Sequence, residues 1–433
     1  MKIKYSNKSF FVIFLVVFFI VGSYFSINTG LSLDEWQEQR NWEYNVALVK
    51  SIIFQTELEP IFKNYGDKFY GVGFQIISQP IQFFLSDFIL KSQDITNFGA
   101  HLISKHFVVF IFFFISGFFV YLIIIKITKD LLISLIGTAL YLLYPYLLGH
   151  GLFNPKDIPF LSLWLICTFV STNIITNLSD DLNIKYKDLI LISFLSAFLL
   201  SIRVTGVLIF VQYLFSSIIF LNIVKVNINF FFKKTFLKIF LFVFLTLFFT
   251  YLLHPVYWKN PFLFIEAINF MRDHFNNVCT LTLGKCMFSN NLDPIYIPAW
   301  LAVKLPLMIL IGLLLLPFTE RKIFVDKSSS IVFGTLLSSS FFIPIILIMI
   351  QANLYDEVRQ ILFLLPLIFI IGLISLYIFS KKIFYLLSIF TACIFFIENI
   401  KIYPYQYAWF NTPSRVFNLS KNFELDYWGL SGR

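Results

Sequence analysis

Eleven apolar runs divide this chain of 433 residues, and they constrain its fold more than any other feature. Each run is about 15–22 residues long, which suits a helix crossing a hydrocarbon core of roughly 30 Å. Backbone polar groups inside a bilayer must be hydrogen-bonded within the chain, so such runs fold as helices. The sequence therefore predicts an all-α polytopic membrane protein with about 11 transmembrane helices. The runs cover residues 9–28, 106–125, 131–149, 158–176, 188–202, 204–222, 238–256, 297–317, 331–350, 360–379 and 383–398.

Composition agrees with this interpretation. Hydrophobic residues make up 58% of the chain and charged residues only 13%, which excludes an ordinary soluble globular protein. The formal net charge of +9 does not require a nucleic-acid partner. Many basic residues fall in short loops between apolar runs, as membrane orientation requires. We therefore expect membrane lipids as neighbours and no nucleic acid.

The first loop, residues 29–105, is long and contains a segment of intermediate polarity at 70–90. Gln75, Gln79 and Asp87 make this segment more polar than the apolar runs around it. We predict an amphipathic helix that lies in the membrane interface. Basic residues precede the first run, which lacks a small-residue cleavage site, so we expect an anchor rather than a removed signal peptide.

Loop charges predict the orientation. Short Lys-rich segments mark the cytoplasmic side, which places the N-terminus inside and the C-terminus outside. The domain prediction is a transmembrane domain over 1–398 with the outer loop 29–105, followed by a short outer tail over 399–433. The basic residues assigned to the inner side are Lys2, Lys4, Lys8, Lys126, Lys129, Lys185, Lys187, Lys225, Lys233, Lys234, Lys238, Arg321, Lys322, Lys327, Lys381 and Lys382.

Acidic residues follow the first and third apolar runs on the predicted outer side. Asp34 and Glu35 are adjacent at the start of the first outer loop, and Asp157 lies in the turn between Pro155 and Pro159. Charged groups beside a membrane span commonly have a function. A solvated loop start remains the alternative for the pair, and helix capping remains the alternative for Asp157.

Four basic residues are candidates for binding a phosphate group. Arg203 lies between two apolar runs and Lys304 lies within one, where an unpaired charge is costly. Lys156 precedes Asp157, and Arg359 follows Asp356 in the turn 351–360. Three of them have a simpler alternative: Arg203 and Lys304 would extend to the membrane surface, and Arg359 would pair with neighbouring acidic residues.

Cysteine and histidine positions point to no metal centre. Cys279 and Cys286 share the outer loop 257–296, where an oxidising compartment would permit a disulfide; two free thiols are the alternative. The five His residues are scattered, and none is spaced from a Cys as in zinc sites. No cofactor is evident, and no visible cluster supports a divalent metal.

The order of these features resembles the GT-C membrane glycosyltransferases. An acidic pair follows the first span, a second acidic loop follows the third, and an outer basic residue lies between the fifth and sixth. The chain is similar to glycosyltransferase family 39 and its neighbours, the protein O-mannosyltransferase and aminoarabinose transferase group. Further blocks look like a bacterial branch of these enzymes. They are Gly149–Phe160, His254–Pro261, Tyr355–Phe363, Tyr403–Asn411 and Phe423–Gly429.

This resemblance implies a GT-C-like fold in the bacterial inner membrane, with the active site facing the periplasm. It implies inverting transfer of a sugar from a polyprenyl-phosphate donor to a glycan, lipid or protein acceptor. Asp34 would be the general base, with Glu35 or Asp157 orienting the acceptor. Arg203, Lys304, Lys156 and Arg359 would bind the lipid phosphate. Two departures are Arg203, where relatives often have Lys, and the short tail in place of an outer soluble domain.

Two other function classes remain open. A transporter or flippase of a lipid-linked saccharide would bind and release its substrate through intramembrane charges. A surface-polysaccharide polymerase or ligase would share the lipid-linked donor but not the acidic first loop. The sequence shows no half-to-half symmetry, and its unusual polar residues fall on one predicted side of the membrane. That distribution favours the enzyme.

Overall fold

The computed structural model describes residues 2–92, 95–178, 182–275, 277–319 and 326–430, most of them in helices. The α-helices are α1 (Lys2–Ser26), α2 (Leu33–Ile53), α3 (Gly73–Ser92), α4 (Asn97–Thr128), α5 (Leu131–Leu143), α6 (Pro145–Phe153), α7 (Asp157–Thr176), α8 (Tyr186–Leu200), α9 (Leu208–Val224), α10 (Ile228–Leu253), α11 (Leu263–Asp273), α12 (Tyr296–Lys304), α13 (Leu307–Leu314), α15 (Lys327–Met349), α16 (Leu365–Phe379), α17 (Lys381–Ile402) and α18 (Leu419–Asn422).

The remaining elements are short. Strands β1 (Cys279–Thr282) and β2 (Lys285–Phe288) pair antiparallel and form one hairpin. The 3-10 helices are η1 (Pro60–Phe62), η2 (Val204–Val207), η3 (Pro255–Tyr257), η4 (Leu316–Phe318), η5 (Arg359–Leu364), η6 (Gln406–Ala408) and η7 (Thr412–Val416). The protein is an all-α integral membrane protein, as predicted.

The number of spans differs from the predicted eleven. Within the described ranges, eight helices are long and apolar enough to cross a membrane, or nine if the bent pair α5 and α6 is one span. The apolar runs 188–202 and 297–317 account for the difference. The first forms α8, which has only 15 residues, and the second is broken into α12 and α13. The break falls at Pro306, which has no backbone N–H to continue the helix.

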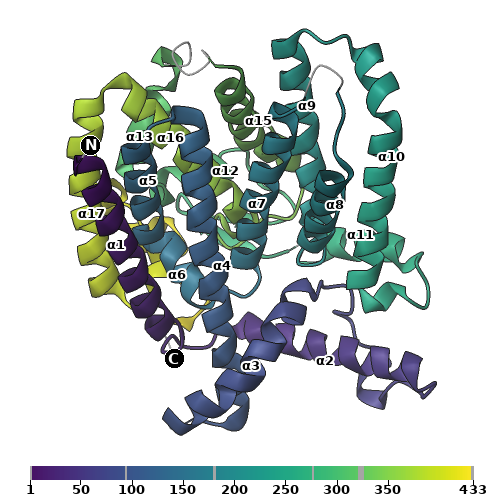
Figure 1. Ribbon diagram of the computed structural model, residues 1–433. Helices are drawn as coiled ribbons and strands as arrows, with labels where there is room; N and C mark the ends of the chain where they lie inside the picture. The colour runs from purple at the N-terminus through teal and green to yellow at the C-terminus, as the bar shows by residue number, and fades with distance from the viewer. Residues whose placement is uncertain (1, 93–94, 179–181, 276, 320–325, 431–433) are drawn as a thin grey trace.

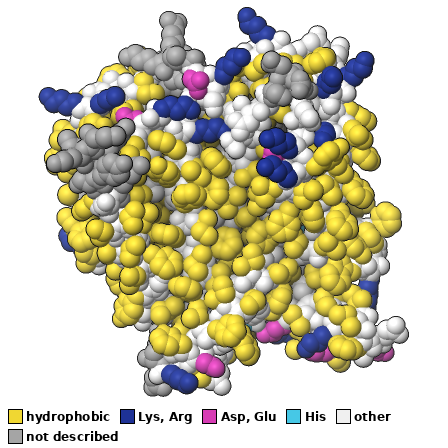
Figure 2. All heavy atoms as spheres, in the orientation of Figure 1, with side chains coloured by type: hydrophobic (Ala, Val, Ile, Leu, Met, Phe, Trp, Pro, Cys, Tyr) yellow, Lys and Arg dark blue, Asp and Glu magenta, His cyan; other side chains and the backbone are white. Residues whose placement is uncertain are grey.

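The helices lie side by side, and α2 and α3 lie across the lower end of the bundle in Figure 1. Figure 2 shows an apolar band around the middle of the same view, with Lys and Arg side chains gathered at the upper end, where α1 begins. Large side chains on α10 are exposed, among them Phe236, Phe240 and Leu247. An apolar surface of this extent suits lipid contact rather than water. Arg321 and Lys322, assigned to the basic side, lie outside the described residues.

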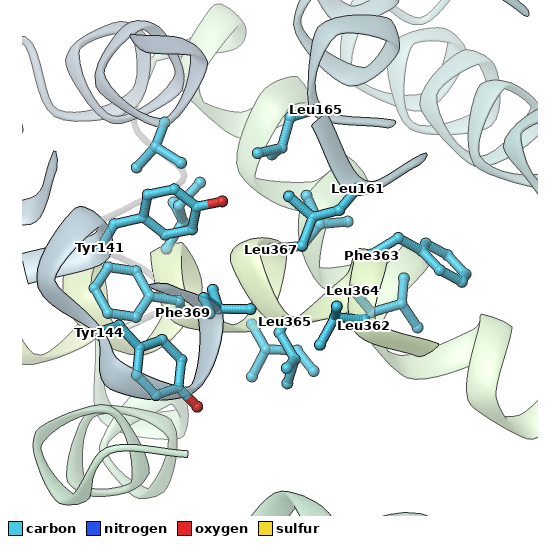
Figure 3. Close-up of a cluster of buried hydrophobic side chains, with 14 of the residues drawn as sticks. Tyr141, Tyr144, Leu161, Leu165, Leu362, Phe363, Leu364, Leu365, Leu367 and Phe369 are labelled. Atoms are coloured by element: carbon cyan, nitrogen blue, oxygen red, sulfur yellow. The ribbon is translucent and has the colours of Figure 1, made fainter. Parts of the chain in front are cut away.

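The core is centred on α16. Its largely apolar sequence is buried from Leu365 to Tyr377, against α13, α15, α17, α4 and α5. Figure 3 shows Leu365 and Phe369 of this helix among Tyr141, Tyr144 and Leu161. Glycine permits the closest helix approach: a Cβ on Gly312 of α13 would lie 1.9 Å from the carbonyl oxygen of Gly372. The backbones of α13 and α16 are therefore in direct contact.

The C-terminal segment after α17 folds back onto the bundle rather than hanging free as a tail. α17 continues to Ile402, beyond the predicted boundary at 398. Phe410 and Phe423 join the main core, and Trp428 packs with Phe153. Residues 431–433 lie outside the described part of the chain.

Candidate functional site

Arg359, at the start of η5, is the centre of a cluster of charged side chains. Its guanidinium is 8% exposed and pairs with three carboxylates. It donates to Asp34 of α2, to Asp157 of α7 at 2.9 Å and to Asp356 at 3.2 Å. Segments that are far apart in the sequence therefore meet at this residue. The alternative that Arg359 pairs with its neighbours holds for Asp356 but describes only part of its contacts.

Asp157 is buried at the first turn of α7 and binds two guanidiniums. One oxygen accepts from Arg203, and the other accepts from Arg359 and from Asn154 at 2.9 Å. The N-cap residue of α7 is Lys156, which makes no side-chain cap, and Asn154 instead binds the backbone of the turn before the helix. Its side-chain oxygen accepts from the backbone N–H groups of Lys156 and Asp157 at 3.2 and 2.9 Å. Asp157 is thus left free to hold the arginines.

Arg203 follows α8, and its partners are on α7 and η5. Its guanidinium donates to Asp157 and to Gln360, and its side chain is only 11% exposed. The chain at Gly71 and Gly73 lies directly against the end of α8. A Cβ on Gly71 would lie 2.1 Å from the carbonyl oxygen of Ser201. Arg203 therefore belongs to the charged cluster and does not simply extend to the membrane surface.

The structure separates Asp34 from its neighbour Glu35. Asp34 is 30% exposed, the most exposed of the three carboxylates that pair with Arg359. Glu35 is fully buried; its oxygens bind Ser32, as the N-terminal cap of α2, and His106 of α4 at 2.7 Å. Glu35 is therefore outside the cluster, and its contacts join α2 to α4.

Lys156 lies beside the cluster in a second ion pair. Its ammonium contacts Glu38 of α2 at 2.8 Å and lies 3.8 Å from the centre of the Tyr70 ring. Glu38 also accepts from Gln75 of α3 at 2.8 Å. Since Glu38 follows Asp34 by one helical turn, both acidic residues project from the same face of α2.

Lys304 is not part of the exposed cluster. Its ammonium is completely buried, 2.8 Å from a carboxylate oxygen of Glu357, and aromatic rings surround it. The centre of the Phe410 ring lies 3.9 Å away and that of Tyr146 4.7 Å. Tyr146 donates to the same carboxylate. This arrangement is an internal ion pair that fixes α12 to the turn before η5, which explains how the membrane tolerates the charge.

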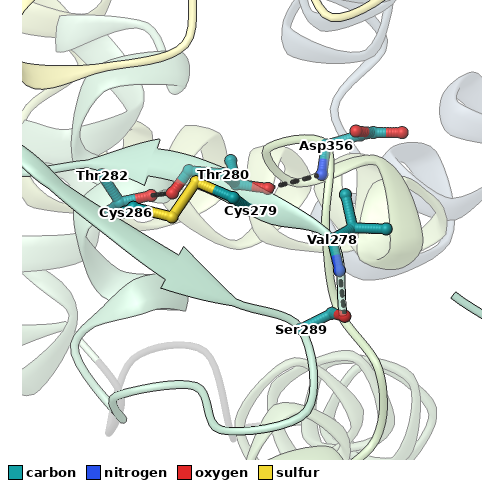
Figure 4. The surroundings of a disulfide bond; sticks show 7 residues. All are labelled: Val278, Cys279, Thr280, Thr282, Cys286, Ser289 and Asp356. Atoms are coloured by element: carbon teal, nitrogen blue, oxygen red, sulfur yellow. Dashed lines mark hydrogen bonds between the residues drawn. A yellow bond between two sulfur atoms is a disulfide. The ribbon is translucent and has the colours of Figure 1, made fainter. Parts of the chain in front are cut away.

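The turn that carries Asp356 and Glu357 has an unusual backbone. Both residues have positive φ, 56° and 63°, a conformation that costs side-chain-bearing residues roughly 1–3 kcal/mol each. The backbone N–H of Asp356 donates to Thr280 of β1 at 3.1 Å. Figure 4 shows this contact beside the disulfide between Cys279 and Cys286, whose Cα atoms are 5.5 Å apart. The disulfide-linked hairpin thus supports the turn.

Burial changes the acid–base properties of this turn. Loss of hydration raises the pKa of Asp356 to about 6, against the opposing effect of the Arg359 charge. It likewise raises the pKa of Glu357 to about 7, although Lys304 favours the carboxylate. Two neighbouring carboxyl groups therefore titrate near neutral pH at the edge of the cluster.

The C-terminal segment covers the cluster. The ring of Trp428 lies 4.2 Å from the guanidinium carbon of Arg359, at a distance typical of a cation–π contact. Gly284 of the hairpin and Glu424 of this segment donate backbone hydrogen bonds in opposite directions between the two. Sequence reasoning did not assign site roles to Asn154, Gln360 or Trp428. Only their proximity to Asp157, Arg359 and the end of the chain could have suggested them.

No group of three or more His, Cys, Asp or Glu side chains is placed to hold a metal ion in the ranges that the structure describes. Asp34, Asp157 and Asp356 do converge, but their oxygens face guanidinium groups. Two cations in the same space disfavour a third.

Comparison with known proteins adds no assignment: no family model, curated protein or solved structure matches this chain.

Proposed function

We propose that this protein transfers a sugar from a polyprenyl-phosphate donor to an acceptor hydroxyl at the membrane face where α2 and α3 lie. The observation that supports this most is the position of Asp34. It is a partly exposed carboxylate that pairs with Arg359, and both Arg359 and Arg203 bind the buried Asp157. A base and an anion-binding group held side by side are what displacement of a lipid phosphate requires.

In the proposed reaction the acceptor oxygen attacks the anomeric carbon, and its proton passes to Asp34. A new carbon–oxygen bond forms as the bond from the anomeric carbon to the phosphate oxygen breaks. The leaving phosphate keeps the electron pair, and Arg203 and Arg359 stabilise its charge. A single displacement of this kind inverts the anomeric centre.

Asp34 and the donor phosphate would compete for Arg359. The donor phosphodiester has one negative charge, as the carboxylate does, and it accepts two parallel hydrogen bonds from a guanidinium. When the phosphate takes over Arg359, Asp34 loses its hydrogen-bonding partner, and its oxygen becomes available to the acceptor hydroxyl. Donor binding would thereby prepare the base.

Two experiments test the proposal. Mass spectrometry of envelope glycans from a deletion strain should show loss of one sugar modification, restored by the intact gene. The purified protein should release free polyprenyl phosphate from a glycosylated carrier only when an acceptor is present. Movement of the intact glycosylated carrier across a vesicle membrane, with its glycosidic bond preserved, would instead identify a flippase and refute the proposal.

A further inference from the structure

The polar side chains between α2, α3 and α4 form a second feature beside the charged cluster. On α2, Glu38, Asn41 and Asn45 continue the face that begins at Asp34, at spacings of four, three and four residues, and all three are buried. This polar stripe leads from the proposed reaction centre into the space between the three helices.

α3 turns its polar side inward and its apolar side outward. Gln75, Ser78 and Gln82 are buried against α2 and α4, whereas Phe83 and Phe84 are 74% and 78% exposed. A helix in a soluble protein shows the opposite pattern. The outward side suits lipid, and the inward side needs polar partners.

Several polar atoms in this space have no hydrogen-bonding partner among the described protein groups. They are the ammonium of Lys105 and the amide oxygens of Asn41, Gln75 and Gln79. Lys105 is 0% exposed, so water at the protein surface does not reach it. A buried group of this kind is unfavourable unless a partner is supplied.

Contacts with Glu38 and His101 bring the side chains of Gln75, Gln79 and Lys105 near one another between α2, α3 and α4. Gln75 donates to Glu38 at 2.8 Å, and Gln79 on the next turn of α3 lies 2.9 Å from the ring nitrogen of His101. Lys105 follows His101 by one turn of α4 and interacts electrostatically most strongly with Glu38. Glu38 therefore links Gln75 of α3 by a hydrogen bond and Lys105 of α4 by charge.

We propose that this space, bounded by Asn41, Gln75, Gln79 and Lys105, is a subsite for the hydroxyl groups of the donor sugar. A sugar hydroxyl both donates and accepts, so it matches amide oxygens on one side and an ammonium on the other. The carboxylate of Glu38 disfavours a second phosphate there and accepts a further hydroxyl. This proposal rests on the proposed function and assigns the part of the protein that would select the sugar.

Affinity measurements with two kinds of carrier test the subsite. The probes are undecaprenyl phosphate and its glucosyl, galactosyl and mannosyl derivatives. The variants are Gln75→Leu and Lys105→Met, with Lys126→Met as the matched control. Lys126 lies at the opposite end of α4 from Lys105. Its ammonium donates to Asn173 and Thr176 of α7. Lys105→Met should fold, because it removes a buried ammonium that has no hydrogen-bonding partner, and Glu38 keeps Lys156 as its ion-pair partner.

The wild type should bind at least one glycosylated carrier more tightly than undecaprenyl phosphate. Gln75→Leu and Lys105→Met should reduce that preference about tenfold, the effect of one lost hydrogen bond. Both should leave the affinity for undecaprenyl phosphate within about twofold, and Lys126→Met should change neither value. If the wild type shows no preference, or if both variants keep it, the subsite assignment is wrong.

A second measurement separates the subsite from the proposed reaction. Octyl glucoside, octyl galactoside and octyl mannoside contain a sugar but no phosphate. Hydrogen exchange at Gln75–Gln82 should slow with at least one of them in the wild type, and not in Gln75→Leu. That result supports the subsite even if no polyprenyl phosphate binds, which would refute the proposed function alone. Unchanged exchange with all three would overturn the subsite, whatever the carriers do.

Discussion

Arg359 donates a hydrogen bond to Asp34, although 325 residues separate them in the sequence. The pair joins the helix that follows the first span to the turn that precedes the central helix α16. Arg359 also holds Asp157, so a single guanidinium connects the first loop, α7 and η5. The positions of the proposed base and of the phosphate-binding groups therefore depend on one another.

Replacing Asp34 with Asn should abolish transfer. The amide keeps the shape of the side chain but cannot accept the proton of the acceptor, and loss of a general base costs about 10²–10⁴ in rate. Donor binding should persist, because the two arginines remain. Turnover and donor affinity of the purified variant are the measurements. Near-native turnover would show that another group is the base.

Replacing the adjacent Glu35 with Gln should instead lower the stability and leave most of the turnover. Glu35 is buried and binds Ser32 and His106, so the change weakens the attachment of α2 to α4. We expect a lower Tm by several degrees and a turnover per folded molecule within about threefold of wild type, because a buried hydrogen bond that loses its carboxylate is commonly destabilising. A normal Tm with lost turnover would place Glu35 in the chemistry instead.

The sequence was sufficient for the helical class and for the positions of most spans, because apolar length alone determines them. It was insufficient for the number of spans. The run 297–317 reads as one helix by hydropathy, but Pro306 breaks it, and Leu305 before it has an extended backbone. The run 188–202 is apolar, but its helix α8 has only 15 residues and ends at Leu200. Arg203, just beyond it, donates to Asp157.

Only part of the site could be predicted from the sequence, because the sequence does not show which residues meet in the folded chain. A charge in an apolar run identifies a residue that needs a partner, but it does not identify the partner. Arg203 and Lys304 looked alike in sequence, yet one joins Asp157 in a partly open cluster and the other is enclosed with Glu357. Likewise, adjacent Asp34 and Glu35 point to different neighbours, because successive helical residues lie about 100° apart.

The stability of the protein should depend on pH through Glu357. Its pKa is raised to about 7 from an ordinary value of 4.5, chiefly by burial. The folded state therefore holds this proton more tightly than the unfolded state does, and the free energy of unfolding should fall as pH rises from about 4.5 to 7. Tm measured across that range should show the decline.

Glu357→Gln supplies the control for this pH dependence. The amide cannot titrate, so the slope of Tm between pH 4.5 and 7 should become shallower, although the lost partner of Lys304 lowers Tm throughout. An unchanged slope in Glu357→Gln would assign the pH dependence to other groups, of which Asp356, with its pKa of about 6, is the first to test.

The membrane orientation predicts opposite labelling of two exposed residues. In a Cys393→Ser background, a cysteine at Asn290 should react with a membrane-impermeant thiol reagent added to the outside of intact cells. A cysteine at Lys185 should react only after the membrane is opened, because Lys-rich loops remain in the cytoplasm. Reversed labelling would place the charged cluster in the cytoplasm and refute the outward-facing site.

Substitutions of Arg203 distinguish phosphate binding from a purely structural ion pair with Asp157. Arg203→Lys keeps the charge but loses the two-pronged guanidinium, so part of the donor affinity and activity should remain. Arg203→Gln should weaken binding of undecaprenyl phosphate at least tenfold, because the leaving phosphate loses one of its two cations. Thermal unfolding of both variants monitors the structural role, since Asp157 keeps Arg359 as a partner in each. An unchanged affinity for undecaprenyl phosphate in folded Arg203→Gln would remove this residue from the phosphate site and leave it a positioning role toward Asp157 alone.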